Sequence, residues 1–134
     1  MRKYKFYRKY DLTRAERENA YWYAMRYNEL KAEYKILLDT SKGISYSDMP
    51  HGSLNVSSPV EEAAIRAEEI SSKITLIEET AREAAKDLYK YVLFAVTNRG
   101  RGYEYLKNQM NIPCGKNTFY EARRKFYYML AKKI

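Results

Sequence analysis

Apolar residues near the start of the chain recur every three or four positions, which is the period of an amphipathic helix. The stripe consists of Ala20, Tyr23, Tyr27, Leu30, Tyr34 and Leu37. It is preceded by Thr13–Glu16, a capping-box sequence in which a hydroxyl and a carboxylate satisfy free amides of the first turn. It ends before Gly43, and glycine commonly stops helices by adopting the left-handed conformation. We therefore expect one tyrosine-rich helix from Thr13 to the residues before Gly43.

A second and longer stripe predicts a second helix over residues 58–96. Its apolar positions, which alternate spacings of three and four without interruption, are Val60, Ala63, Ala67, Ile70, Ile74, Ile77, Ala81, Ala84, Leu88, Tyr91 and Ala95. Ser58, Pro59 and Glu61 supply an N-cap, a first-turn proline and a capping carboxylate. A heptad pattern of this length indicates a coiled-coil-like seam. Two interpretations can coexist: the seam packs antiparallel on the first helix, or it joins two copies of the chain.

Glycine and proline are confined to residues 43–59 and 100–115, and these two stretches divide the chain. The stretch at 43–59 indicates an irregular linker, which we expect over residues 41–57. The elements expected after the second helix are a break at 97–102, a short helix over 103–110, a turn at 111–115 and a last helix over 116–133. This order is typical of a helix-turn-helix unit. We thus expect an all-α fold, with two long helices joined by an irregular linker and followed by a C-terminal helix-turn-helix, organised as segments 1–57 and 58–134.

The last predicted helix has one apolar face and one basic face. The apolar face consists of Phe119, Ala122, Phe126, Met129 and Leu130. The first turn of a recognition helix enters the major groove of DNA, so Lys116, Asn117 and Tyr120 are expected to touch base edges or phosphates. Arg124 lies one turn further along and is expected to reach the groove. Its neighbours Arg123 and Lys125 are expected to contact the phosphate backbone. The full expected DNA-binding set is Lys116, Asn117, Thr118, Tyr120, Arg123, Arg124, Lys125, Arg99 and Arg101.

Positive charge is concentrated at the two ends of the chain. The net charge is +8, yet residues 61–87 carry eight acidic and four basic side chains, while residues 98–134 carry nine basic and two acidic ones. This polarity is typical of proteins that bind polyanions. The first ten residues form a basic arm with aromatic residues between its charges: Arg2, Lys3, Lys5, Arg8 and Lys9. The arm either follows the DNA backbone or minor groove, or packs its rings on the helices while its charges stay in water.

Several classes of function find no support in the sequence. Cys114 is the single cysteine and His51 the single histidine, so neither an internal disulfide nor a structural metal site is expected. We interpret Cys114 as a half-buried turn residue and His51 as a solvent-facing one, because neither belongs to an activating motif. We therefore expect no enzyme activity and no cofactor. Apolar runs as long as Tyr91–Val96 are far shorter than the ~20 residues of a membrane span, so a cytoplasmic protein without membrane contact is expected.

The C-terminal segment resembles a known family. The strings Ile112–Tyr120 and Arg123–Ala131 are similar to the end of phage late-gene transcription regulators of the RinA/ArpU type, and so are Ile44–Pro50 and the capped start of the second helix. The resemblance covers residues 43–134. It implies a helix-turn-helix similar to region 4 of sigma factors, which binds a phage promoter in the bacterial host and activates late genes, with RNA polymerase as a partner. Gly115 stands where a serine or threonine N-cap is usual, a change that weakens the cap by only a few tenths of a kcal/mol.

The leading hypothesis is therefore a DNA-binding transcriptional regulator that acts on double-stranded DNA, as a homodimer if the seam joins two copies. The alternative is a helical protein–protein interaction module, whose seam binds a polymerase subunit or another phage protein without reading DNA. A third hypothesis is RNA binding through tyrosine stacking and arginine contacts. The dependence of binding on salt separates these hypotheses. A protein that neutralises DNA phosphates releases their counterions, so its affinity for DNA falls steeply as the salt concentration rises.

Overall fold

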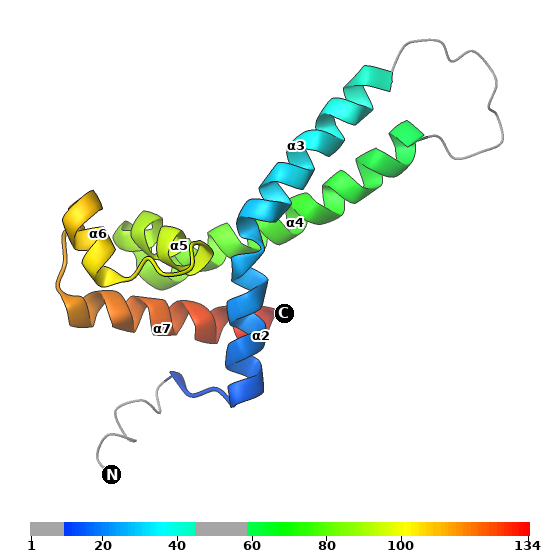
Figure 1. Cartoon of the computed structure of the whole chain (residues 1–134). Helices are drawn as coiled ribbons and strands as arrows, with labels where there is room; N and C mark the ends of the chain where they lie inside the picture. The colour runs from blue at the N-terminus through cyan, green and yellow to red at the C-terminus, as the bar shows by residue number, and fades with distance from the viewer. Residues whose placement is uncertain (1–9, 45–58) are drawn as a thin grey trace. The chain divides into compact units, whose positions relative to one another are not determined.

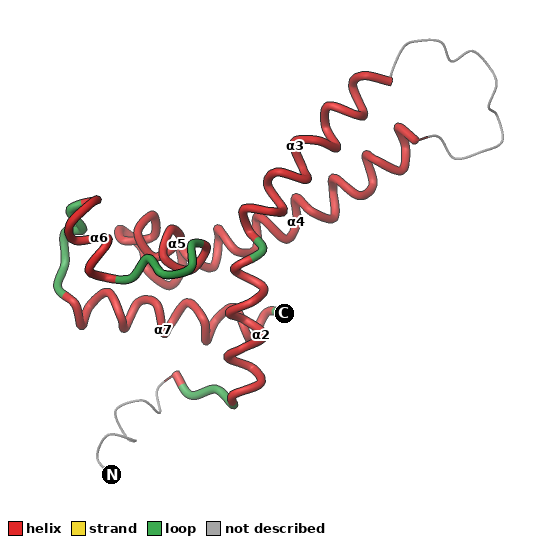
Figure 2. Tube along the Cα trace, viewed as in Figure 1, coloured by secondary structure: helices red, strands yellow, loops and turns green. Residues whose placement is uncertain are grey.

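The computed structural model describes residues 10–44 and 59–134, and every regular element in these ranges is helical (Figures 1 and 2). The elements are α2 (Arg14–Met25), α3 (Tyr27–Ile44), α4 (Pro59–Ala85), a 3-10 turn η2 (Lys86–Leu88), α5 (Tyr89–Thr97), α6 (Tyr103–Met110) and α7 (Lys116–Lys133). The expected all-α class is confirmed. Within the described ranges, no helix combines the length and the apolar character that crossing a membrane requires. The basic arm, His51, most of the linker and the Ser58 N-cap lie outside the described residues.

Contacts group the chain into two compact units. Unit 1 comprises residues 1–27 and 76–134, and unit 2 comprises residues 28–75. This grouping differs from the two consecutive segments, 1–57 and 58–134, that the pattern suggested. The difference arises because unit 1 combines α2 with the C-terminal helices, which are distant from α2 in the sequence.

The predicted start of the first helix is confirmed, but its continuity is not. Thr13 caps α2 through both bonds of a capping box: the Glu16 amide donates to the Thr13 hydroxyl (3.1 Å) and the Thr13 amide donates to the Glu16 carboxylate (3.0 Å). That backbone bond lowers the pKa of Glu16. The prediction of one helix is wrong, because α2 ends at Met25 with Arg26 as its C-cap, and a separate helix, α3, runs from Tyr27 to Ile44, past Gly43. Arg26 keeps right-handed torsion angles (φ −80°, ψ −4°), so the apolar spacing runs through the break unchanged.

The second predicted helix is also interrupted. Lys86 adopts a left-handed conformation (φ 49°) at η2, between α4 and α5. A non-glycine residue in this conformation costs roughly 1–2 kcal/mol. Ala84 and Ala85 before the break and Val92 after it are all buried in unit 1, so burial of apolar surface on both sides offsets the cost.

Within unit 2 the heptad seam is covered by α3, which runs alongside α4 (Figure 1). The seam residues Ala63, Ala67 and Ile70 are buried. Arg66 of α4 forms an ion pair with Glu33 of α3, with 3.0 Å between Nη2 and Oε2. The intramolecular pairing of the seam therefore exists in this unit, while dimerisation stays a prediction.

Unit 1 is built around α7. Its largest fully buried side chains are Val92, Val96, Leu106, Phe119, Phe126, Leu130, Ile77 and Thr80. α2 and α5 both pack against α7, and α6 packs against both α5 and α7. At the end of α7, the Lys133 ammonium donates to Thr80 (3.1 Å) and pairs with Glu83 (2.8 Å), which fastens it to the last turns of α4. The result is a firmly held C-terminal helix whose other end, at Lys116, begins after the turn from α6.

Candidate nucleic-acid interface

The α6–turn–α7 segment has the helix bounds that the sequence predicted, and its turn is held by specific bonds. Asn111 ends α6 in the left-handed conformation (φ 52°), and the Ile112 amide donates to the Leu106 carbonyl (3.2 Å). The hydroxyl of Tyr103 donates to the Cys114 carbonyl across the turn (2.9 Å). Because Tyr103 opens α6 and Cys114 lies two residues before α7, this bond fixes the start of α7 relative to α6.

The predicted apolar face of α7 is the face that packs. Phe119, Phe126 and Leu130 have no exposed surface, and Ala122 and Met129 are half-buried. The ring of Phe119 lies 6.0 Å from that of Tyr103, so the same residue that holds the turn also supports the helix behind it. Packing on this side leaves the opposite side of α7 to carry any contact with a ligand.

The first turn of α7 is open. Gly115 occupies the N-cap position without a side-chain bond to the helix, and no acidic residue lies in the first turn. Lys116, Asn117 and Thr118 are all exposed, as the sequence predicted for residues that contact DNA. A helix N-terminus presents free amides and a partial positive charge, both of which favour a phosphate.

The three basic residues in the middle of α7 point to three different surroundings. Arg123 lies over the rings of Tyr120 (4.7 Å) and Phe119 (5.6 Å). Arg124, expected to reach the groove, lines a pocket formed with Tyr10–Leu12, Arg17 and Tyr127. Lys125 lies on another side of the helix, facing the end of α4. The continuous basic face that the sequence suggested is thus divided, and only its first turn is fully exposed.

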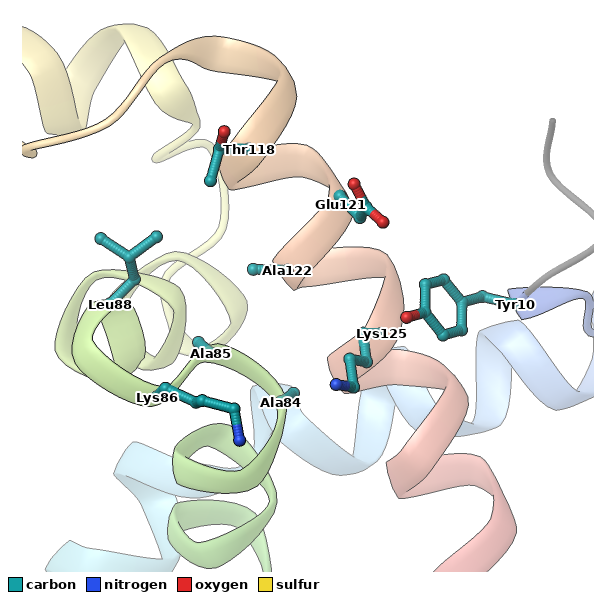
Figure 3. A pocket seen from close by; sticks show the side chains of 9 residues that line it. All are labelled: Tyr10, Ala84, Ala85, Lys86, Leu88, Thr118, Glu121, Ala122 and Lys125. Carbon is teal, nitrogen blue, oxygen red and sulfur yellow. The ribbon is translucent and has the colours of Figure 1, made fainter.

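Lys125 lines a cavity of about 350 Å³ between α7 and the break at η2. Figure 3 shows Thr118, Glu121, Ala122 and Lys125 on one wall, Ala84, Ala85, Lys86 and Leu88 on the other, and Tyr10 at the edge. Three alanines line it, and Lys86 and Lys125 bring ammonium groups to it from opposite walls. The strained Lys86 thus adds a positive charge next to α7, which the sequence pattern did not reveal.

The loop between α5 and α6 contributes the other predicted arginines. Gly100 takes a left-handed conformation (φ 82°) and the Arg101 amide donates to the Asn98 carbonyl (3.3 Å), so the loop is a tight turn. The Arg99 guanidinium lies 6.0 Å from the Trp22 ring, and that of Arg101 lies 4.6 Å from the Tyr105 ring. The structure brings both arginines to the same cavity as Arg123.

That cavity also includes Tyr21 and Tyr127, which the sequence reasoning did not place near the site. Burial raises the pKa of the Tyr127 phenol to about 12, so this group is a neutral donor at ordinary pH. The tyrosine-rich composition was the available signal, but it does not say which rings approach which arginines.

The surroundings of Cys114 do not activate its thiol. Burial raises the pKa of the half-buried Cys114 thiol, which is the opposite of what an activated nucleophile needs. In the part of the chain that the structure describes, no group of three or more histidine, cysteine or acidic side chains is placed to hold a metal ion. The chain has no match among protein-family models, curated proteins or solved structures.

Proposed function

We propose that the chain binds double-stranded DNA with the first turns of α7 and acts as a transcriptional regulator of the phage late-gene type. The observation that carries the proposal is the open first turn of α7. Lys116, Asn117 and Thr118 are exposed, the turn has no acidic residue, and the helix behind it is anchored by Phe119 and by the Tyr103–Cys114 bond. Presenting polar side chains from a rigid helix end is what insertion into a major groove requires.

The charge of the surrounding segment supports the same proposal. Residues 98–134 carry nine basic and two acidic side chains. Neutralising DNA phosphates releases counterions and supplies most of the affinity of such proteins. The other basic side chains of this segment are therefore suited to hold α7 on the duplex by contacting phosphates, while the first turn of α7 meets the bases.

Each proposed contact has a specific chemistry. An asparagine side chain recognises adenine by two hydrogen bonds in the major groove, which suits Asn117. Lys116 suits either a guanine edge or a phosphate. Lys125 suits the phosphate backbone, and Arg124, which lies one turn beyond the first turn of α7, suits a further base contact.

The regulatory part of the proposal comes from the resemblance of residues 43–134 to phage late-gene regulators. That resemblance supports a promoter as the DNA site, activation as the outcome and RNA polymerase as a protein partner. It also supports action in the cytoplasm of a bacterial host.

Footprinting on the DNA segment that encodes the protein tests the proposal. The wild-type chain should protect a defined site, and Asn117→Ala should lose discrimination at one base pair, worth about 1–3 kcal/mol. Asn19→Ala is the matched control, because Asn19 is exposed on α2. Lys125→Ala should weaken binding to all sequences alike, whereas Arg124→Ala should relax site preference.

Two results would contradict DNA binding by α7. Absence of duplex binding at low salt contradicts the proposal. Equal affinity for single-stranded RNA and duplex DNA favours the RNA-binding hypothesis instead.

One observation favours a second candidate, a protein partner for unit 2. Ile36 of α3 and Ile65 of α4 are 64% and 55% exposed, although large apolar side chains are usually buried. Because the seam itself is covered within the unit, such a partner would contact these outer positions. Sedimentation at several concentrations, with Ile36→Lys as the variant, tests whether the partner is a second copy: a concentration-dependent mass that the variant lowers supports it, and a constant monomer mass excludes it.

A further inference from the structure

Three arginines converge on one cavity of unit 1. Arg99 and Arg101 reach it from the loop between α5 and α6, and Arg123 reaches it from α7. The cavity has a volume of about 290 Å³ and is also lined by Tyr21 and Tyr127. No acidic residue lines it. Three positive charges therefore share a small space with aromatic rings and a glycine-containing turn.

None of these three guanidinium groups is neutralised within the described part of the chain. Among the described residues, no carboxylate forms an ion pair with Arg99, Arg101 or Arg123. Arg99 and Arg101 are exposed and Arg123 is half-buried, so all three keep contact with solvent. Like charges that line one cavity still repel one another, and a bound anion removes that repulsion.

Aromatic rings orient the three groups. The guanidinium of Arg99 lies over Trp22, that of Arg101 over Tyr105 and that of Arg123 over Tyr120. Tyr105 itself stacks on Phe94, with 5.7 Å between ring centroids and 14° between planes. Stacking leaves the edges of a guanidinium, where its N–H donors lie, available for hydrogen bonds. The ring contacts thus leave the N–H donors of all three guanidinium groups available to a ligand.

We propose that this arginine cavity binds a phosphate group. Arginine forms paired, charge-assisted hydrogen bonds with phosphate oxygens, and several arginines match a tetrahedral anion better than a flat carboxylate. The Tyr127 hydroxyl, which stays protonated at ordinary pH, adds a neutral donor. The phosphate belongs either to a strand of bound DNA or to a free phosphorylated ligand, and the inference does not depend on base reading by α7.

Titration of the full chain with inorganic phosphate tests the inference, with chloride adjusted to keep the ionic strength constant. Trp22 is the single tryptophan of the chain and lies beside Arg99, so its fluorescence reports on the cavity. A saturable change is expected. Arg101→Gln should weaken phosphate binding roughly tenfold or more, because it removes a charged hydrogen bond.

Two further variants make the result specific. Arg82→Gln is the matched control, because Arg82 also lies over a tyrosine ring (Tyr89, 4.9 Å) but does not line the cavity. Arg101→Lys keeps the charge and loses the paired donors, so its affinity should fall between those of the wild type and Arg101→Gln. Circular dichroism of each variant verifies that the chain is folded. A linear, non-saturating response to phosphate, or equal binding by Arg101→Gln and Arg82→Gln, overturns the inference.

Duplex DNA then distinguishes the two sources of the phosphate. If DNA occupies the cavity, Arg101→Gln lowers the slope of log affinity against log salt by about 1 and phosphate competes with DNA. If a free ligand occupies it, phosphate still binds while the DNA slope is unchanged. Because the phosphate titration contains no DNA, failure of DNA binding by α7 leaves this test intact.

Discussion

The bond between Tyr103 and Cys114 offers the sharpest test of how the start of α7 is positioned. Tyr103→Phe removes a single hydroxyl from a side chain that is 8% exposed, and it leaves the ring contact with Phe119 in place. The lost bond is 2.9 Å long, and it leaves the Cys114 carbonyl without its donor. Since Cys114 is only half-buried, water replaces part of that bond.

These facts fix the expected magnitude. A typical intramolecular hydrogen bond contributes about 0.5–1.5 kcal/mol, and partial hydration keeps the cost of the orphaned carbonyl low. We expect Tyr103→Phe to lower the free energy of unfolding by about 1 kcal/mol, equivalent to a fall in Tm of roughly 4 °C. Exchange of the Ile112 and Phe119 amides, which donate to the Leu106 and Gly115 carbonyls, should also become faster, because the turn opens more often.

Tyr105→Phe provides the control. It removes a hydroxyl from the same helix, and Tyr105 has ring contacts but no hydrogen bond through this hydroxyl to any described residue. Urea unfolding followed by circular dichroism should therefore show a lower midpoint for Tyr103→Phe alone. Equal midpoints for the two variants, or unchanged amide exchange in the turn, would refute the idea that this bond positions α7.

Two further predictions concern the break in the second helix and the alkaline stability of unit 1. Lys86→Gly should raise the free energy of unfolding by about 0.5–1 kcal/mol, because glycine relieves the left-handed strain at φ 49°. Lys90→Gly, at an exposed position inside α5, is the control and should lower the free energy of unfolding by about 1 kcal/mol. If thermal unfolding shows that both variants change stability in the same direction, Lys86 is not strained. Burial raises the pKa of Tyr127 from 10.0 to about 12, so the folded state keeps this proton longer than the unfolded chain. The resulting stability is complete below pH 10 and is lost as pH rises towards 12, by about 2 kcal/mol. Tyr127→Phe should flatten this alkaline decline in urea titrations at several pH values, and a decline as steep as in Tyr105→Phe would argue against it.

The C-terminal segment was the most predictable part of the fold. Gly115 and the Asn111–Cys114 turn separate two short apolar stripes, so local signals alone locate α6 and α7. The same local signals gave the capping box at Thr13, because the two partners of a capping box are three residues apart. At Thr13 and in the turn between α6 and α7, the stabilising contacts lie within one or two turns, and there local chemistry predicts the structure.

The two helix breaks were not predictable from such signals. Neither Arg26 nor Lys86 is a glycine or proline, and neither interrupts the spacing of apolar residues. Both breaks belong to the packing of unit 1, which combines α2 with helices that follow far later in the chain. Buried contacts between segments that are distant in the sequence offset the conformational cost of a helix break. A single sequence does not show which distant segments will make those contacts.

The candidate site divides in the same way. Exposure of Lys116 and Asn117 follows from the apolar period of their own helix, and the sequence predicted it. Convergence of Arg99 and Arg123 with Tyr21 depends on where α2 crosses unit 1, so the sequence named the arginines but not the cavity that they form.

Duplex DNA affinity as a function of salt is the most direct test of the central claim that α7 binds DNA. Fluorescence anisotropy of a labelled duplex carrying the footprinted site provides the measurement. If Lys116, Lys125 and the three arginines of the cavity each neutralise a phosphate, log affinity should fall against log salt with a slope of about −4 to −5. No binding at about 50 mM salt, or a slope near zero, would contradict the account.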